Sequence, residues 1–399
     1  MSQKKITISG TGCSLVDYLY SGVDFSSPVF QKYISKNLGD GGLYPGHLVF
    51  TEELEKFANK TFDEILREIV GDRPPDSYNV GGPSIVSLIH TSQLLNTNDF
   101  IVKFYGAAGD DQTSERIFKS LQNCPLNTEH YYVFDERYTP FTNVFTDPNY
   151  NQGQGERTFV NNIGAAWDYT PDHIPAEFFN SDIVCFGGTA IVPHIHDNLT
   201  FLLKKAKQNN CITIVNTVFD FRNEKRLPGK RWPLGDSDES FQYIDLLIMD
   251  QDEALRISGT SNIDEAVGFY IHQNVSSFII TRGADTIIAW SGGTFFKKTG
   301  VLYFPVSESI TKELKNNSQN SADTTGCGDN FVGGIISSIA WQIQSNQSEL
   351  LDLTEACAWG VSSGGYACLY MGGTYHQSSP GEKLEKIKPY YKAYKEQIK

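Results

Sequence analysis

Short runs of β-branched and other apolar residues alternate with longer amphipathic segments along most of this chain. Several short runs, such as Ile183–Phe186, Leu246–Met249 and Phe278–Ile280, contain no polar residue, as expected of strands that are covered on both faces. Strands that alternate with helices favour parallel pairing, so the pattern predicts an α/β fold with a mostly parallel sheet. We expect strands at residues 4–9, 100–105, 131–135, 141–146, 182–187, 211–216, 244–249, 277–281, 286–290 and 301–306. We expect helices at residues 52–69, 83–95, 111–122, 197–208, 252–258, 263–273, 330–344 and 353–370.

Three stretches depart from this alternation. Residues 128–162 hold two short runs without space for a helix between them, followed by a polar, Gly-rich turn, and they predict a small antiparallel unit that projects from the main sheet. Residues 22–50 are rich in Gly, Ser and Pro and are expected to be irregular. Residues 307–321 are polar and are predicted to form a mobile loop. We find no repeat and no linker that would separate two autonomous domains.

Composition narrows the classes of function. The chain has 399 residues and a formal net charge of -14 at pH 7, which would repel a nucleic-acid backbone or an anionic membrane. Nucleotide binding remains compatible, because backbone N–H groups can hold phosphates locally. The seven cysteines include no Cys-x-x-Cys pair, which argues against a zinc site or a disulfide framework. Without a signal-like or membrane-spanning stretch, the sequence indicates a soluble, cytoplasmic protein.

The most informative motif is Asp323-Thr-Thr-Gly-Cys-Gly-Asp329, which leads into an apolar segment with helical character. Gly326 and Gly328 allow the backbone to approach a phosphate closely, and the N–H groups and dipole of a helix that begins here would bind an anion. Phosphoryl transfer needs such charge stabilisation and a base near the attacking hydroxyl, and Asp329 stands where that base could act. Taken alone, Asp329 could equally be a helix N-cap.

This motif resembles the C-terminal signature of the ribokinase-like (PfkB) carbohydrate kinases. Other segments resemble the family in the same order: Gly10–Asp17 its opening strand, Asn79–Ser84 its Gly-Gly motif, Phe104–Asp111 the next strand–turn–helix, Gly155–Thr158 a lid segment, and Thr281–Ala284 a nucleotide-phosphate contact. The resemblance implies one ribokinase-like domain over residues 1–399, with a mostly parallel central sheet flanked by helices. A small β-sheet lid would come from segments near 12–50 and 128–162.

The resemblance also implies roles for individual residues. Asp329 would be the general base, and the backbone N–H groups of Gly326, Cys327 and Gly328 would form an anion hole.

Substrate hydroxyls would be held by Asp17, Gly81 and Gly82, since a carboxylate accepts hydrogen bonds from neighbouring hydroxyls. Without the family, Asp17 would be interpreted as a residue that caps a loop.

The implied reaction transfers the γ-phosphate of ATP, with Mg²⁺, to a hydroxyl of a small sugar-like substrate, a sugar or sugar acid before a nucleoside. Nucleic acids and membranes are not expected partners. The family would also allow a homodimer through the lid and, in some members, a monovalent cation. The residues implied for nucleotide binding are Thr281, Gly283 and Thr325, and those implied for metal binding are Asp250, Glu253 and Asp323.

Three departures from the family pattern concern specificity. Val86 stands where an Asn often contacts substrate, Thr286 stands where a Gly is common near the nucleotide, and extra sequence lies between Val23 and Tyr78. In addition, Asp250 replaces the Asn of an Asn-x-x-Glu motif, although its oxygen still suits a hard cation. These changes keep open a rival interpretation, a non-catalytic sugar- or nucleotide-binding protein that retains the kinase fold.

Two other motifs are set aside. Gly360-Val-Ser-Ser-Gly364 fits a nucleophile elbow, but such a serine must follow a strand and this segment is predicted to be helical. His194 and His196 have no accompanying set of metal ligands nearby in the sequence.

Overall fold

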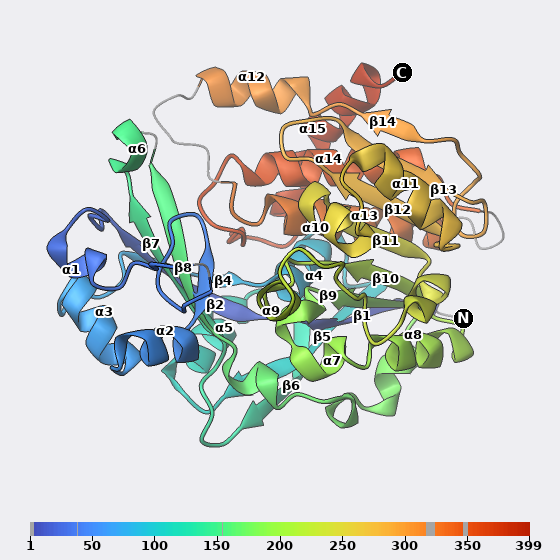
Figure 1. The fold of residues 1–399 in the computed structure, drawn as a ribbon. Helices are drawn as coiled ribbons and strands as arrows, with labels where there is room; N and C mark the ends of the chain where they lie inside the picture. The colour runs from blue at the N-terminus through green and yellow to red at the C-terminus, as the bar shows by residue number, and fades with distance from the viewer. Residues whose placement is uncertain (1–3, 38, 154, 317–323, 346–349) are drawn as a thin grey trace.

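The computed structural model describes residues 4–37, 39–153, 155–316, 324–345 and 350–399. Its strands form one sheet of nine strands and one of five, and the smaller sheet lies beside one end of the larger one (Figure 1). The expected α/β class, with a mostly parallel sheet flanked by helices and a small additional sheet, is confirmed. No described helix is both long and apolar enough to span a bilayer.

The large sheet is parallel over most of its width. Its strands are, in spatial order, β14 (Leu302–Phe304), β13 (Ile287–Ser291), β12 (Ser277–Thr281), β11 (Leu246–Asp250), β10 (Ile212–Asn216), β9 (Ile183–Gly187), β1 (Ile6–Gly12), β5 (Phe100–Gly109) and β6 (Leu126–Phe134). From β12 to β6 every neighbouring pair is parallel, whereas β13 pairs antiparallel with both of its neighbours. The carboxyl ends of the parallel strands therefore lie along one edge of the sheet.

Helices cover both faces of the large sheet, as the apolar strands require. One face packs against α4 (Pro83–Leu94), α5 (Gln112–Leu121), α13 (Cys327–Ser345), α14 (Leu353–Ala367) and α15 (Glu382–Gln397). The other face packs against α8 (Leu199–Gln208), α10 (Gln251–Ser258) and α11 (Ile263–His272). Shorter helices are α6 (Tyr150–Gly153), α7 (Pro193–His196), α9 (Phe221–Arg226) and α12 (Glu308–Asn316), and 3₁₀ turns are η1 (Gly164–Trp167), η2 (Pro171–His173), η3 (Ala176–Asn180), η4 (Thr189–Ile191) and η5 (Asp238–Tyr243).

The small sheet has one polar and one apolar face. Its strands are, in spatial order, β3 (Leu48–Phe50), β8 (Glu156–Asn162), β7 (Phe141–Asp147), β2 (Leu15–Ser21) and β4 (Ser77–Gly81). Side chains alternate between the faces of a strand, and the strand register places Asp17, Asn79, Thr142 and Asn161 on one face. The same alternation places Arg157 on this face, four residues before Asn161.

The extra sequence between residues 23 and 78 covers the apolar face of the small sheet. Three helices, α1 (Pro28–Gln31), α2 (Thr51–Ala58) and α3 (Phe62–Val70), lie on its outer side (Figure 1). Their buried side chains form a cluster with sheet residues such as Phe145 and Val160. The sequence thus builds a separate small core beneath the sheet, where we predicted only irregular chain for residues 22–50.

The prediction of one continuous helix over residues 52–69 is wrong. The chain forms two helices because Asn59 takes the left-handed conformation at φ 51. Thr61 then caps α3, with its hydroxyl accepting from the Glu64 N–H and the Glu64 carboxylate accepting from the Thr61 N–H. Both signals, an Asn at a helix end and a Thr-x-x-Glu capping box, are present in the sequence.

Two further predictions are corrected. Residues 141–162 do form an antiparallel pair, but the run before them is β6, which pairs in parallel with β5 at the edge of the large sheet. The predicted loop over 307–321 begins with α12, whose Ile310 is buried; residues 317–323 lie outside the described part of the chain. Strand β2 and helix α15 were not predicted.

The outer cluster is predicted to contribute to stability. Ile65 of α3 is fully buried within it, so Ile65→Ala should lower the free energy of unfolding by about 2–5 kcal/mol. Urea denaturation would measure the loss, with Leu66→Ala as a control because Leu66 is only partly buried. Equal small losses in both variants would contradict a packed core under the small sheet.

Candidate active site

The predicted site residues lie where several parallel strands end. Asp250 closes β11 and is paired in register with Thr281, which closes β12. Gly12 closes β1, which is separated from β11 by β10 and β9 in the same sheet. In open α/β sheets, ligands bind at the carboxyl ends of the strands. This edge faces the polar side of the small sheet, because the Arg157 guanidinium on β8 donates a 3.2 Å hydrogen bond to the Thr325 hydroxyl just before α13.

The glycine turn before α13 is held in close contact with a second loop. Gly326 has φ 72, and a Cβ atom there would lie 2.4 Å from the Cα atom of Gly373. Only glycine fits this combination of left-handed backbone and close approach. The Cys327 N–H donates to the Thr324 carbonyl at 3.2 Å, so the turn is closed by a hydrogen bond of its own. Of the predicted anion-binding glycines, Gly326 therefore directly precedes α13 and Gly328 lies in its first turn.

A buried asparagine fixes this turn. Asn330 is fully buried, and its amide nitrogen donates to the carbonyls of Gly326 and Gly373, each at 2.8 Å. Its amide oxygen accepts from Tyr370 at 3.0 Å and lies 2.7 Å from His90 Nδ1 on α4. Asn330 thus joins the start of α13 to the loop at residue 373. Sequence reasoning missed its role, although it directly follows Asp329.

Asp329 lies in the first turn of α13 and is partly exposed. Desolvation by the surrounding protein raises the pKa of its carboxyl to about 6. A carboxyl with a pKa near the working pH of an enzyme is suited to proton transfer.

Asp17 lies near the same point. Burial raises the pKa of the Cys13 thiol, and the negative charges of Asp17 and Asp329 raise it further. Because the charges of both carboxylates act on one thiol, the two predicted residues lie in the same region of the structure, near Cys13.

The position of the Asp17 carboxylate depends on Gly81. The residues lie on adjacent strands, and a Cβ atom on Gly81 would be 2.1 Å from Asp17 Oδ2. Any larger residue would displace the carboxylate. Gly82 precedes Pro83 at the start of α4 with φ 105, and the Ile85 N–H donates to the Cys13 carbonyl at 3.3 Å. The segment just before β2 is therefore joined to the first turn of α4, which begins two residues after the Gly81 that Asp17 contacts.

Asp250 and Glu253 begin α10 and cap it reciprocally. The Asp250 carboxylate accepts from the Glu253 N–H at 2.8 Å, and the Glu253 carboxylate accepts from the Asp250 N–H at 3.0 Å. The Thr217 hydroxyl also donates to Glu253 at 2.5 Å. Burial raises the pKa of Glu253, and the charges of Asp250 and Asp329 add to the effect.

The acidic pair fits a divalent cation that keeps water ligands. Mg²⁺ in phosphoryl-transfer sites takes one or two carboxylates together with phosphate oxygens, and a cation would relieve the repulsion that raises the pKa of Glu253. The described residues contain no group of three His, Cys, Asp or Glu side chains placed to hold a metal. Asp323 lies outside the described residues.

The predicted nucleotide contacts lie at the ends of separate elements. Thr281 ends β12 with its hydroxyl 3.4 Å from the Met249 carbonyl, and Gly283 follows in a left-handed turn with φ 60. Thr325 belongs to the turn before α13 and contacts Arg157. The first two residues are grouped at the β11–β12 end of the site, and Thr325 lies at its lid-facing side.

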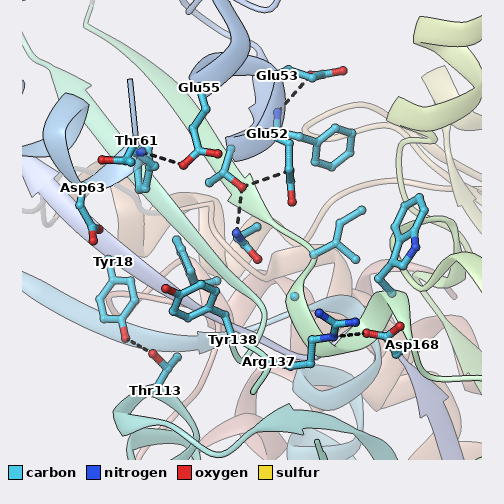
Figure 2. Close-up of a pocket in the computed structure, with 18 of the residues that line it drawn as sticks. Tyr18, Glu52, Glu53, Glu55, Thr61, Asp63, Thr113, Arg137, Tyr138 and Asp168 are labelled. Atoms are coloured by element: carbon cyan, nitrogen blue, oxygen red, sulfur yellow. Dashed lines mark hydrogen bonds and ion pairs between the residues drawn. The ribbon is translucent and has the colours of Figure 1, made fainter. Parts of the chain in front are cut away.

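A groove lies elsewhere on the molecule, between α2, the loop after β6 and the segment that follows β8 (Figure 2). Its volume is about 1140 Å³, and none of the predicted site residues lines it. Its charged walls are largely paired, with Arg137 donating to Asp168 at 2.5 Å and Lys225 contacting Glu53. The groove is therefore separate from the site at the start of α13.

The two motifs set aside behave as expected. Residues 360–364 lie inside α14, where the Ser362 hydroxyl donates to the Ala358 carbonyl. His196 is buried, with Nδ1 3.0 Å from the Thr189 hydroxyl and Nε2 3.7 Å from Asp220. Neither arrangement offers a nucleophile or a metal site.

Comparison with known proteins defines the class as phosphotransferases that act on a hydroxyl group. Residues 76–379 match the pfkB family of carbohydrate kinases, and the chain belongs to that family. Adenosine kinase of Schizosaccharomyces pombe and adenosine kinase 2 of Arabidopsis thaliana are each 24% identical over 311 residues, covering 73% of this chain and 83% of theirs.

Solved structures share the fold. A probable sugar kinase from Rhizobium etli superposes with a TM-score of 0.68 at 15% identity, covering 97% of this chain and 99% of that one. Adenosine kinase from Schistosoma mansoni, in complex with 2-fluoroadenosine, gives 0.66 at 18% identity, with coverages of 93% and 97%. Arabidopsis thaliana ribokinase, complexed with ribose and ATP, gives 0.63 at 13% identity, with coverages of 96% and 99%.

The Cys327 thiol is predicted to be the most consequential one to modify. It lies at the N-terminus of α13, where the dipole favours a thiolate, although nearby Asp329 opposes this effect. Its sulfur lies 3.1 Å from that of Cys368. Iodoacetamide should inactivate the enzyme, and ATP should slow the loss by occupying the same turn.

Each variant would be compared with its own starting activity. Cys327→Ala should remain active, because its backbone N–H is kept, and should resist the reagent, because the thiol is gone, whereas Cys368→Ala should remain sensitive. If Cys327→Ala is inactivated as fast as the parent, another cysteine is responsible.

Proposed function

We propose that this enzyme transfers the γ-phosphate of ATP to a hydroxyl of a small sugar-like substrate, with Asp329 as the general base. The observation that carries the proposal is a carboxyl of raised pKa in the first turn of α13, directly beside a glycine turn. The substrate hydroxyl would lose its proton to the Asp329 carboxylate as its oxygen attacks the γ-phosphorus. The bond to the bridging oxygen would break, and ADP would leave.

The N–H groups of Gly326, Cys327 and Gly328 would stabilise the charge on the transferred group. For the Cys327 N–H to do so, its hydrogen bond to the Thr324 carbonyl must open. Thr281, Gly283 and Thr325 would contact the nucleotide. Asp250 and Glu253 would hold Mg²⁺, and bound magnesium supplies positive charge against the phosphate oxygens.

The substrate would lie between Asp17 and Asp329, under the polar face of the small sheet acting as a lid. Asp17, with the backbone of Gly81 and Gly82, would hold its hydroxyls. Because Arg157 already joins β8 to Thr325, movement of the small sheet would be coupled to the turn that receives phosphate. We therefore propose that this sheet closes over the substrate.

The two candidate substrates are a sugar or sugar acid, which the sequence alone ranked first, and a nucleoside. The family of carbohydrate kinases supports the sugar, whereas the similarity to two adenosine kinases supports the nucleoside. Phe159 lies between Arg157 and Asn161 on the same face of β8, the polar face of the small sheet, and is partly exposed. An aromatic side chain at this position could stack on a nucleobase. An ATP-coupled assay against sugars, sugar acids and nucleosides separates the two, and no turnover with any of them would contradict the proposed function.

Replacement of the base tests the mechanism directly. Asp329→Asn should keep the fold, because the amide has the same shape, but should lower kcat about 10²–10⁴-fold through loss of the proton acceptor. Steady-state kinetics and thermal unfolding would be measured on the same preparation. A folded Asn variant with near-normal turnover would exclude Asp329 as the base.

The fall in activity at acid pH should also reflect the protonation of Asp329. A general base works when deprotonated, so kcat/KM should fall as the pH drops through about 6, the raised pKa of Asp329. An ordinary aspartate would place this fall near about 4. The residual activity of Asp329→Asn serves as the control, since it retains the titration of ATP itself. A fall near pH 4 in the parent would contradict the assignment.

A further inference from the structure

A lysine is buried directly behind the glycine turn of the site. Lys383 lies in the first turn of α15, beyond the part of the chain that matches the family, which ends at residue 379. Its side chain is only 1% exposed. Lysine is almost never fully buried unless its charge is paired, so this position requires an explanation.

The partners of Lys383 do not include a carboxylate in the part of the chain that is described. Its ammonium nitrogen donates to Asn330 Oδ1 at 2.9 Å. It lies 5.8 Å from the ring centres of both Tyr370 and Tyr375, in cation–π geometry. Burial lowers the pKa of Lys383 well below its ordinary value. The ammonium group of Lys383 is therefore buried without a carboxylate partner among the described residues, in surroundings that disfavour its charge.

A fold-stabilising role alone does not account for this lysine. Taking an ammonium group out of water costs several kcal/mol, and replacing buried charges by apolar side chains is often neutral or stabilising. Asn330 does not need the lysine as a donor, because Tyr370 donates to the same oxygen at 3.0 Å and His90 Nδ1 lies 2.7 Å from it. A methionine would fill a similar volume without that cost.

The hydrogen bonds lead from Lys383 to the proposed anion hole. The amide that accepts from Lys383 donates, through its nitrogen, to the Gly326 carbonyl at 2.8 Å. That carbonyl belongs to the same peptide group as the Cys327 N–H. Each hydrogen bond in such a chain polarises the next, which makes the Cys327 N–H a stronger donor. In addition, the positive charge of a protonated Lys383 is little screened in the protein interior.

We propose that Lys383 is a positioning residue that, through Asn330, supplies a buried counter-charge for the phosphate group bound at the start of α13. The inference rests on the proposed function, because it takes this turn as the γ-phosphate site. Phosphate would favour the charged form of the lysine, as a nearby anion does for any ammonium. Lys383 would then stabilise a bound ligand more strongly when the ligand carries more negative charge at the glycine turn before α13.

The test compares two ligands that differ by one phosphate group. The affinities of the parent, Lys383→Met and Lys383→Gln for ADP and for a non-hydrolysable ATP analogue would be measured by calorimetry with Mg²⁺ and without acceptor. The parent should bind the ATP analogue more tightly than ADP. The ratio of these two affinities should be about 10-fold smaller in Lys383→Met. Its melting temperature should be equal to or above that of the parent.

The glutamine variant separates charge from hydrogen bonding, because its amide can still donate to Asn330. It should lose the preference as Lys383→Met does, and it carries the test if the Met variant does not fold. Lys386→Met is the matched control, since Lys386 lies on the same helix and is exposed, pairing with Glu382 at 2.9 Å. The control should keep the parental preference.

The proposal is overturned if Lys383→Met, or Lys383→Gln, prefers the ATP analogue as strongly as the parent. A lower melting temperature with an unchanged preference would identify Lys383 as a structural residue only. These readouts involve no turnover, so they are independent of Asp329. Near-normal turnover of Asp329→Asn would remove the proposed base while leaving the binding result for Lys383 intact.

Discussion

The side-chain amide of Asn330 is the interaction on which the site depends. Because it is fully buried, both ends of the amide must be hydrogen-bonded, and this requirement brings separate segments together. Its nitrogen donates to Gly326 and Gly373, and its oxygen contacts side chains from α4, the loop after α14 and α15. An asparagine side chain is short, so these segments cannot separate without breaking the set. The backbone on either side of Gly326 is thereby held by protein contacts alone, and only the Cys327 N–H, which is bonded to the Thr324 carbonyl, would have to change partner to bind an anion.

The small sheet is joined to the helices around the site by hydrogen bonds of two kinds. Just before β2, the Cys13 carbonyl accepts from the Ile85 N–H in the first turn of α4. On β8, the Arg157 guanidinium donates to the Thr325 hydroxyl just before α13. The first bond joins two backbone groups, whereas the second joins two side chains, each of which has other rotamers. The β8 side is therefore the less rigidly joined side of the sheet.

Much of the fold was predictable because it rests on local signals. Continuous apolar runs gave the central strands, and the glycine motif located the start of α13 to within a few residues. The failures have physical reasons. β6 and β7 look alike in sequence, and only pairing over long distances assigns them to different sheets. The polar segment before the motif becomes α12 through one buried side chain, Ile310. Lys383 carries no sequence signal at all, since an isolated lysine at the start of a helix is usually solvated.

The helices inserted between residues 23 and 78 change what the small sheet can do. An uncovered apolar sheet face of this kind is a natural interface between subunits, and a homodimer through the lid would use it. Here Phe25, Phe30 and Ile65 fill that face from the same chain. A homodimer through this surface would need to displace a core that is already packed, so any self-association should use another surface. The same cover leaves the polar side of the sheet facing the turn before α13 without help from a partner subunit, because its apolar side is already out of water.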